Sequence, residues 1–533
     1  MKIFFNGNVY TGRGGRASAF AVENGRFVSV GQDAELLAAS SGADELIDLG
    51  GAFVSCGFND SHMHLLNFGQ VLSFAPLHMH TGSLEEVLSC LREHMNSHPS
   101  GWLRGRGWNQ DCFSGEKRMP SRWDLDTVSR DVPIVITRAC GHCCVLNSKA
   151  LELCGIDGST PSPDGGSIGK AGGEADGRLF DNAMELLSGK LPLPSKDELK
   201  AMILSACREL NRYGITSCQT DDYCVFREIP PEAVNEAYRE LENEGALTVR
   251  VYEQCNITEL SALERFMDEG NLTGRGSDMF RIGPLKLLGD GALGSRTAHL
   301  SKPYPGTDDC GFSLLAPEHL KAMAALAHSR GMQIAVHAIG DACLDEVLDA
   351  FEAALAERPK ADHRHGVVHC QVSRPDQLER MIKLGVHIYA QSIFLDYDNH
   401  IVHSLLPPEI AASSYNWKTL MRGGLSVSNG SDCPVELPDV MCGIECAVTR
   451  RSIDGTGPYN PDQAFTVAEA IDSFTVNGAE ASFEEKEKGL IAPGHAADFV
   501  VWGADPFETE PRRLHEISID SVYLAGKRVY DAK

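Results

Sequence analysis

Apolar positions in the central part of the chain follow two alternating spacings. Short runs rich in Val, Ile and Leu, typical of buried strands, are separated by longer segments with the 3.6-residue period of amphipathic helices. Eight strand-like runs occur, at 52–55, 216–219, 249–252, 283–287, 333–337, 366–369, 386–390 and 425–428. The helical segments between them include 198–213, 317–329 and 344–356. Since eight alternating strand–helix units close a parallel sheet, the pattern predicts an α/β fold with a TIM-like (β/α)8 barrel.

Both ends of the chain have a different pattern, in which short apolar runs are joined by turn residues. The strand-like runs are 3–5, 19–22, 26–30, 497–502, 521–524 and 528–530. Asn24-Gly25 and Ala525-Gly526 are typical of hairpin turns. Because neither end can bury much apolar surface alone, we expect one small β-sandwich domain built from residues 1–54 and 485–533, with the barrel at 55–484.

The stretch after the first predicted barrel strand is too long for one strand–helix unit. It contains a helical pattern near 83–96, a Gly/Arg/Trp segment at 101–108, a strand pattern at 132–138 and Gly-rich polar sequence at 161–177. We therefore expect an inserted subdomain at about 70–200. Insertions at this end of a barrel usually shape the substrate pocket.

Charge and hydropathy narrow the range of partners. The 533-residue chain has a formal net charge of −26 and a pI of about 5.1, which disfavours nucleic acid and anionic membranes, because both attract basic patches. No run of about 20 apolar residues suggests a membrane span, and the first residues are too short an apolar stretch for a signal peptide. We expect a cytoplasmic protein that acts on a small molecule, and a homodimer, since large barrels often form homo-oligomers.

The sequence contains 17 cysteines, and two of them form a motif of their own. Cys140 and Cys143 have the spacing of a disulfide-isomerase motif, so a thiol oxidoreductase is one alternative function. That function needs a small thioredoxin-like domain around the motif, and the surrounding pattern does not predict one. We expect the other cysteines to be reduced and mostly small core residues.

Candidate metal ligands recur near the ends of the predicted strands. His62 and His64 are two residues apart, so in extended backbone their imidazoles point to the same side. Further candidates at strand ends are Lys286, His337, His369 and Asp432. The carboxyl ends of barrel strands meet at one face, so these side chains are expected to converge there. Four histidines and an aspartate suit zinc, manganese or another borderline metal.

Each of these residues also has an ordinary structural interpretation. His337 and His369 are compatible with core histidines, Asp432 with a helix N-cap before Pro434, and Lys286 with an ion pair to Asp290 or a solvated charge. All of these interpretations would have to hold at separate strand ends, so a shared site is the simpler hypothesis.

With these residues in place, the sequence resembles the amidohydrolase superfamily, and within it the third amidohydrolase family, which includes N-substituted formamide deformylases. The motifs are GFNDSHMH (57–64), KLLGDGALGSRTA (286–298), VHAIGD (336–341), HCQ (369–371), GSDCP (430–434) and KGLIAPGHAADFV (488–500). The insertion adds GRGWN (105–109), GH (141–142) with NS (147–148), and DGG (164–166). The resemblance covers nearly the whole chain.

The resemblance implies a metal-dependent hydrolase that cleaves a non-peptide amide-type C–N bond. One divalent metal, most simply Zn²⁺, would bind His62, His64 and Asp432. A second would bind His337 and His369, with a carbon dioxide-derived carbamate on Lys286 as the bridge. If Lys286 is unmodified, the four histidines would share one metal. Asp432 would be the general base and acid.

The resemblance also suggests residues that contact the substrate: Arg106, Trp108, His142 and Arg296. Their alternative roles are structural hydrogen bonds and packing. The chain departs from the family at Cys140, where relatives have Asp, at Val368, where relatives often have Glu, and at Cys56, where Pro is common.

Other functions stay open at this point. They are another reaction of the superfamily on the same metal centre (lactone or ester hydrolysis, deamination or isomerisation), and a non-catalytic binding protein on this fold.

Overall fold

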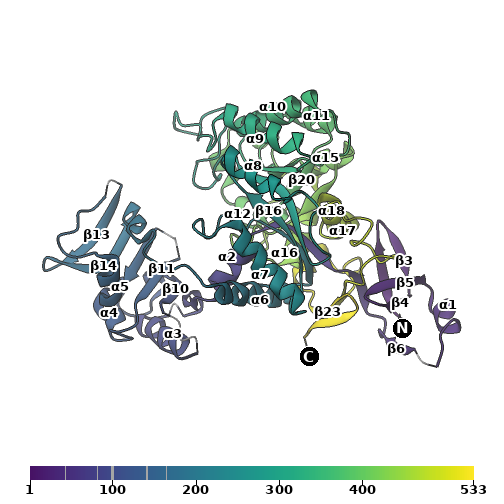
Figure 1. Cartoon of the computed structure of the whole chain (residues 1–533), viewed down its shortest axis with the longest axis horizontal. Coiled ribbons are helices and arrows are strands. Elements are labelled where there is room, and N and C mark those ends of the chain that lie inside the picture. The colour runs from purple at the N-terminus through teal and green to yellow at the C-terminus, as the bar shows by residue number, and fades with distance from the viewer. Residues whose placement is uncertain (43, 81, 98–100, 140–141, 164, 533) are drawn as a thin grey trace. The chain divides into compact units, whose positions relative to one another are not determined.

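The computed structural model describes residues 1–42, 44–80, 82–97, 101–139, 142–163 and 165–532 (Figure 1). The chain forms two compact units. One contains residues 1–67 and 203–533, and the other residues 68–202. Within the described residues, no helix is long and apolar enough to cross a membrane.

An eight-stranded parallel sheet forms the centre of the first unit. In order along the chain and across the sheet, its strands are β8 (Phe58–Met63), β15 (Ile215–Thr220), β16 (Arg250–Asn256), β17 (Phe280–Leu288), β18 (Ile334–Ala338), β19 (Gly366–His369), β20 (His387–Ala390) and β21 (Val427–Asn429). Hydrogen bonds from Asp432 N to His62 O (2.8 Å) and from His64 N to Cys433 O (2.8 Å) join the first strand to the segment that follows the last. The predicted α/β fold is confirmed, and the sheet fits a TIM-like barrel.

Helices connect successive strands of this sheet. They include α6 (Lys196–Arg212), α7 (Pro231–Asn243), α8 (Leu260–Asp268), α9 (Pro317–Ser329), α10 (Asp341–Glu357), α11 (Pro375–Leu384) and α15 (Trp417–Arg422), and α16 (Val440–Thr449) follows the last strand. Local sequence explains their limits. Pro317 and Pro375 occupy the first turns of α9 and α11, where no N–H is needed, and Gly385 ends α11 with a φ of 70°.

Strands from both ends of the chain form two further sheets in the first unit. A four-stranded sheet contains β5 (Arg26–Gly31), β4 (Ala19–Glu23), β1 (Lys2–Phe5) and β6 (Glu45–Asp48). A six-stranded sheet contains β24 (Lys527–Asp531), β23 (Ile519–Leu524), β22 (Phe499–Trp502), β7 (Phe53–Cys56), β2 (Asn8–Gly12) and β3 (Gly15–Ala17). Phe20 packs against both Phe4 and Phe499, with ring centroids 4.9 Å apart in each pair, so the sheets share one core.

The expectation that the run at 52–55 is the first barrel strand is wrong. This run is β7, which pairs with β22 of the terminal sheet, and the barrel strand β8 starts after Gly57. A Cβ at Gly57 would lie 2.2 Å from Thr216 Oγ1, so only glycine fits where the chain passes from one sheet to the other. Residues 53–63 therefore leave the terminal sheet and enter the barrel sheet at Gly57, and the hydrophobic pattern does not show where this happens.

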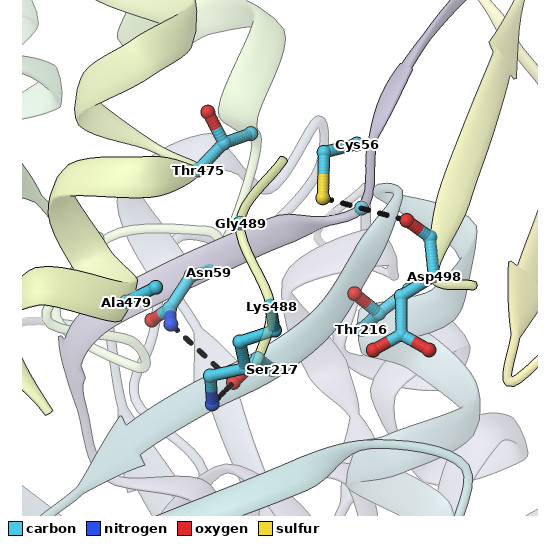
Figure 2. A pocket seen from close by; sticks show the side chains of 10 residues that line it. Cys56, Asn59, Thr216, Ser217, Thr475, Ala479, Lys488, Gly489 and Asp498 are labelled. Carbon is cyan, nitrogen blue, oxygen red and sulfur yellow. Dashed lines mark hydrogen bonds between the residues drawn. The ribbon is translucent and has the colours of Figure 1, made fainter. Parts of the chain in front are cut away.

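Buried charges connect the terminal sheets to the barrel. Arg250 donates to both carboxylate oxygens of Asp498, at 2.7 and 3.1 Å. Lys488 Nζ lies 2.7 Å from Ser217 Oγ and 2.6 Å from Glu484 Oε2. Figure 2 shows the small cavity beside Lys488, which residues at the starts of β8 and β15 line. It lies at the end of the strands opposite to the predicted ligands.

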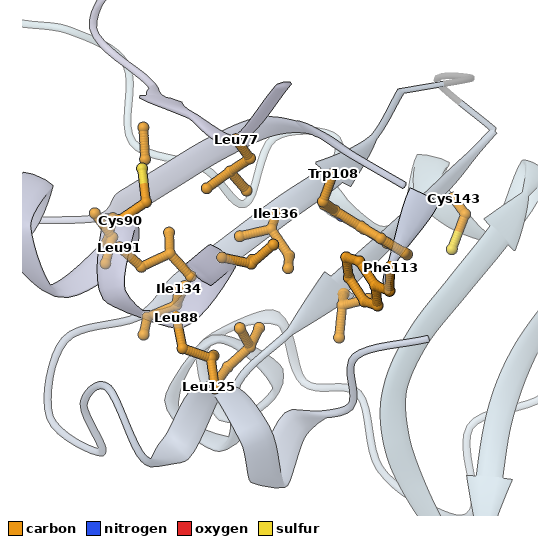
Figure 3. Close-up of a cluster of buried hydrophobic side chains, with 14 residues drawn as sticks. Leu77, Leu88, Cys90, Leu91, Trp108, Phe113, Leu125, Ile134, Ile136 and Cys143 are labelled. Carbon is orange, nitrogen blue, oxygen red and sulfur yellow. The ribbon is translucent and has the colours of Figure 1, made fainter. Parts of the chain in front are cut away.

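The second unit has its own six-stranded sheet. Its order is β13 (Gly166–Ala171), β14 (Glu174–Asp181), β12 (Cys143–Leu146), β11 (Ile134–Arg138), β10 (Leu103–Trp108) and β9 (Ala75–Pro76). Helix α3 (Leu84–Ser97) supplies Leu88 and Leu91 to a hydrophobic cluster under this sheet (Figure 3). The Gly-rich stretch, which the hydrophobic pattern did not mark as strands, forms the β13–β14 hairpin, with Gly172 and Gly173 at positive φ.

Candidate metal centre

The predicted ligands come from the carboxyl ends of five barrel strands. His62 lies in β8, Lys286 in β17 and His337 in β18, whereas His369 is the last residue of β19. His64 follows β8 by one residue, and Asp432 follows β21 by three. The structure brings three of them within ligand distance of one another: His62 Nε2 and His64 Nε2 lie 3.3 and 3.2 Å from Asp432 Oδ1. The His369 ring lies 5.5 Å from that of His62 and 4.4 Å from that of His337.

Three of the four imidazoles have their Nδ1 atom held by an oxygen. The contacts are His62 Nδ1 with Gln254 Oε1 (2.7 Å), His64 Nδ1 with the carbonyl oxygen of Asp221 (3.0 Å) and His369 Nδ1 with Gln391 Oε1 (2.8 Å). These oxygens only accept hydrogen bonds, so they place the proton on Nδ1 and, in a neutral ring, leave a lone pair on Nε2. This is the usual outer-shell arrangement around metal-binding histidines.

The arrangement around Asp432 fits a divalent cation. Burial, and then the nearby positive charge of Lys286, lower the pKa of His62 to about 4, so its ring is neutral at pH 7. Its Nε2 lone pair therefore faces Asp432 Oδ1, a buried oxygen without a hydrogen bond among the described residues. Two facing acceptors repel each other unless a cation lies between them. Two imidazoles and one carboxylate are a ligand set that Zn²⁺ prefers.

The pKa of His64 is also shifted by the carboxylate of Asp432. Burial alone would lower its pKa, but its contact with Asp432 at 3.2 Å and the negative charge of that carboxylate raise it well above the usual value. Burial would likewise raise the pKa of Asp432, but its contacts with His62 and His64 lower it well below the usual range. Asp432 is therefore an anionic group at neutral pH. A helix-capping role is excluded by position, because the N-cap of the next helix, α16, is Asp439.

The backbone is strained at two of the candidate ligands. His369 has a φ of 72° and Asp432 a φ of 59°, in the left-handed region that costs residues other than glycine about 1–3 kcal/mol. The strained conformation of His369 is supported by Trp417, whose Nε1 donates to the His369 carbonyl at 3.0 Å. Strain of this kind usually persists where it orients a functional side chain.

Asp60 holds the loop that carries Asp432. Its carboxylate accepts hydrogen bonds from Ser431 N (3.0 Å), the Ser431 hydroxyl and His62 N (3.2 Å). Burial raises the pKa of Asp60 to about 7. Gly430 permits this packing, because a Cβ there would lie 2.5 Å from His62 N. One side chain thus fixes the first and last ligand segments to each other.

Lys286 is buried, and its partner differs from the one expected. Its Nζ lies 3.6 Å from Asp221 Oδ2, so the ion pair it forms is with Asp221, in place of the pair with Asp290 that the structural interpretation offered. Asp290 instead accepts hydrogen bonds from the backbone N–H groups of Ile339 (3.0 Å) and Gly340 (2.8 Å), beyond β18. Those two N–H groups are otherwise orphaned by the turn after His337, which explains why Asp290 faces away from the lysine.

His337 differs from the other histidines in its tautomer. Its Nε2 contacts the carbonyl oxygen of Gly291 at 3.1 Å, so the proton lies there and the lone pair is on Nδ1. If His337 binds a metal, it therefore binds through the nitrogen opposite to the one that His62, His64 and His369 present.

Asp221 and Cys224 were missed by sequence reasoning. Asp221 touches two predicted site residues, because its carbonyl fixes His64 and its carboxylate faces Lys286. Cys224 Sγ lies 3.9 Å from His64 Nδ1, and His64, Asp221 and Cys224 form a second group with ligand spacing among the described residues. The only available signal was position, since both residues follow the barrel strand β15.

The four predicted substrate-contacting residues lie in different surroundings. Arg296 is exposed on the loop after β17. Arg106 and His142 are exposed in the second unit, where His142 Nδ1 lies 3.3 Å from Asp181. Trp108 is fully buried in the hydrophobic cluster of that unit, so its contacts are those of packing (Figure 3). Cys140 lies outside the described residues, and Cys143 is buried in β12.

Comparison with known proteins establishes the family. The sequence model of the amidohydrolase family matches residues 45–530. The chain belongs to the amidohydrolase family. The family resemblance that the motifs predicted is therefore confirmed.

Individual relatives of this amidohydrolase span its whole length. The amidohydrolase YtcJ of Bacillus subtilis (strain 168) is 33% identical over 542 residues, which cover 99% of each chain. The N-substituted formamide deformylase of Arthrobacter pascens is 28% identical over 554 residues, covering 99% of this chain and 98% of the enzyme. The solved structure of a metal-dependent hydrolase from Pyrococcus furiosus has a TM-score of 0.80 at 29% identity, covering 95% of this chain and all of that one.

Proposed function

We propose that this amidohydrolase is a metal-dependent hydrolase that cleaves a non-peptide amide-type C–N bond. The observation that carries the proposal is the convergence of His62 Nε2 and His64 Nε2 on the buried, anionic Asp432. Family membership and full-length similarity to a formamide deformylase support an amide as the substrate.

Under this proposal, His62, His64 and Asp432 hold one divalent metal, of which Zn²⁺ fits the ligand types best. His337 and His369 hold a second when Lys286 carries a carbamate, since an ammonium group offers no lone pair to a metal. When bound, the metal lowers the pKa of water toward neutrality and polarises the scissile carbonyl. Its bond to Asp432 competes with a proton, so loading is expected to weaken in acid.

Asp432 performs the proton transfers. Its contacts with His62 and His64 keep it ionised at neutral pH, so the carboxylate has a free site for a proton from an attacking water whose own pKa a bound metal would lower. The leaving nitrogen needs that proton to depart as an amine, and the same carboxylate returns it. Gln254, Asp221 and Gln391 keep the histidine rings in the orientation and tautomer that the reaction needs.

Replacement of Asp432 by Asn tests the mechanism. We expect hydrolysis of a set of formamides and N-acyl amines to fall by about three orders of magnitude, as for loss of a general base and metal ligand together. Circular dichroism should show an unchanged fold. Persistent activity in Asp432→Asn would refute the role of Asp432.

Metal content measured by plasma mass spectrometry tests the number of sites. Close to two metals per chain after incubation with zinc and bicarbonate would support a carbamate on Lys286, and close to one would leave Lys286 paired with Asp221. If no metal is bound after this incubation, the proposal of a metal-dependent hydrolase is refuted and a binding protein on this fold is favoured.

A further inference from the structure

Exposed apolar side chains of the barrel are concentrated at one end of the sheet. Between residues 203 and 486, all of which are described, seven large apolar side chains are 36–64% exposed. Leu260, on α8, is one of them. The other six all follow the carboxyl ends of β17, β20 and β21: Leu288, Phe312, Leu314, Tyr397, Val435 and Leu437. Exposed apolar groups gathered in this way mark a binding surface, whereas scattered ones do not.

Three of the six form a patch beside β17. Leu288 ends that strand, two residues after Lys286. The segment with Phe312 and Leu314 runs alongside it, because Leu314 N donates to Gly289 O at 2.7 Å and Ser313 forms a bridge with Asp290. We call Leu288, Phe312 and Leu314 the β17 patch.

The other three form a patch beside β21. Val435 and Leu437 flank Glu436, shortly after Asp432. Tyr397, in α12 (Leu395–Asp398), is flanked by two aspartates, Asp396 and Asp398. Ile393, four residues before Tyr397, and Pro438, next to Leu437, line the same small cavity, so the two segments are neighbours. We call Tyr397, Val435 and Leu437 the β21 patch.

The strand order places the two patches on opposite sides of the candidate metal centre. β17 is the fourth strand and β21 the eighth in a sheet whose first and last strands are joined by hydrogen bonds. Four of eight positions is half of the circumference. The candidate ligands from β8, β18 and β19 lie between these two strands in the ring.

We propose that the substrate carries an apolar group on each side of the scissile C–N bond, one on the acyl carbon and one on the nitrogen. A formamide has only hydrogen on the acyl side and would leave one patch in water. An N-acyl amine with two apolar arms covers both patches while its carbonyl lies at the ligands. This inference rests on the proposed amide hydrolysis and narrows its substrate class.

Four amides test the inference on the zinc-loaded enzyme: N-methylacetamide has two short arms, N-hexylformamide and N-methylhexanamide have one long arm each, and N-hexylhexanamide has two. Each methylene that leaves water on binding is worth about fourfold in kcat/KM. We expect N-hexylhexanamide to be the best substrate, by at least about tenfold over either amide with one long arm. Equal kcat/KM for N-hexylformamide and N-hexylhexanamide would overturn the inference, whereas no turnover of any amide would overturn the proposed function itself.

Variants of each patch identify the surfaces involved. We expect Leu314→Ser to flatten the dependence on the length of one arm, and Leu437→Ser to flatten the dependence on the other. Leu260→Ser is the control, at an exposed leucine outside both patches (37% exposed, against 49% for Leu314 and 62% for Leu437), and should leave both dependences unchanged. If each patch variant reduces the dependence of kcat/KM on both arms equally, the assignment of one patch to each arm is wrong. The assignment is also wrong if the variants change only the sedimentation coefficient, since the patches would then join two copies of the chain.

Discussion

Two buried histidines, His328 and His365, lie at the end of the barrel opposite to the candidate metal centre, and their contacts allow a quantitative prediction about stability in acid. His365 Nδ1 accepts a hydrogen bond from Ile334 N at 3.2 Å, so its proton lies on Nε2, 2.8 Å from His328 Nδ1. The His328 Nε2 proton in turn faces the Arg358 carbonyl oxygen at 2.6 Å. Every ring nitrogen of these two histidines is paired while both rings are neutral. An added proton on either ring would face an N–H donor.

The size of the effect follows from the pKa of His365. Burial, and then the neighbouring His363 and His328, lower it to about 2, against about 6.5 in an unfolded chain. Below pH 6.5 the unfolded state therefore binds one proton more than the folded state. Stability is fully present above that pH and falls with acid. Between pH 7.5 and pH 5 the loss from this residue is about 2 kcal/mol.

The assay is urea unfolding, followed by circular dichroism, of the wild type and His365→Gln at both pH values. Gln can still donate to His328, but it cannot take up a proton. The variant is less stable at pH 7.5, and we expect its deficit to shrink by about 2 kcal/mol at pH 5. His403→Gln, at an exposed histidine, is the control and should show no such change. A His365→Gln deficit that is equal at both pH values would refute the neutral, paired arrangement.

Three further predictions concern single side chains. Trp417→Phe removes the donor to the His369 carbonyl, so we expect zinc binding to weaken by about tenfold in protein that is still folded by circular dichroism; unchanged zinc affinity would contradict the supporting role of Trp417. Asp498→Asn leaves Arg250 buried with an uncompensated charge and should cost about 3–5 kcal/mol in urea unfolding, whereas a cost near zero would show that the pair is dispensable. Cys143→Ser should leave the rate of amide hydrolysis within about twofold, because Cys143 packs in β12, and a large loss would revive the thiol hypothesis.

The sequence pattern was most informative where chain periodicity determines structure. Seven of the eight strand-like runs coincide with strands of the eight-stranded sheet, and the position of histidines at strand ends predicted which side chains approach one another. It was least informative where one residue redirects the chain. The apolar run before His62 splits into β7 and β8 at Gly57, because the steric limit comes from Thr216, more than 150 residues away.

Contacts made only on folding account for the other differences. Lys286 forms its ion pair with Asp221 and not with Asp290, because Asp290 accepts hydrogen bonds from backbone N–H groups beyond β18. Trp108 is of a residue type that is common in binding sites, yet it is buried in the hydrophobic cluster of the second unit, which side chains from the neighbouring strands complete. Neither outcome has a local signature in the sequence.

The hydrogen bonds that join the segment after β21 to β8 also set an order of events during synthesis. His62 and His64 leave the ribosome about 370 residues before Asp432 does, so for most of translation the two histidines exist without their carboxylate. The complete ligand set arises only when Asp432 N reaches His62 O and His64 N reaches Cys433 O. If these residues bind a metal as proposed, tight binding would be confined to chains whose barrel is complete, and truncated products would offer only the two histidines.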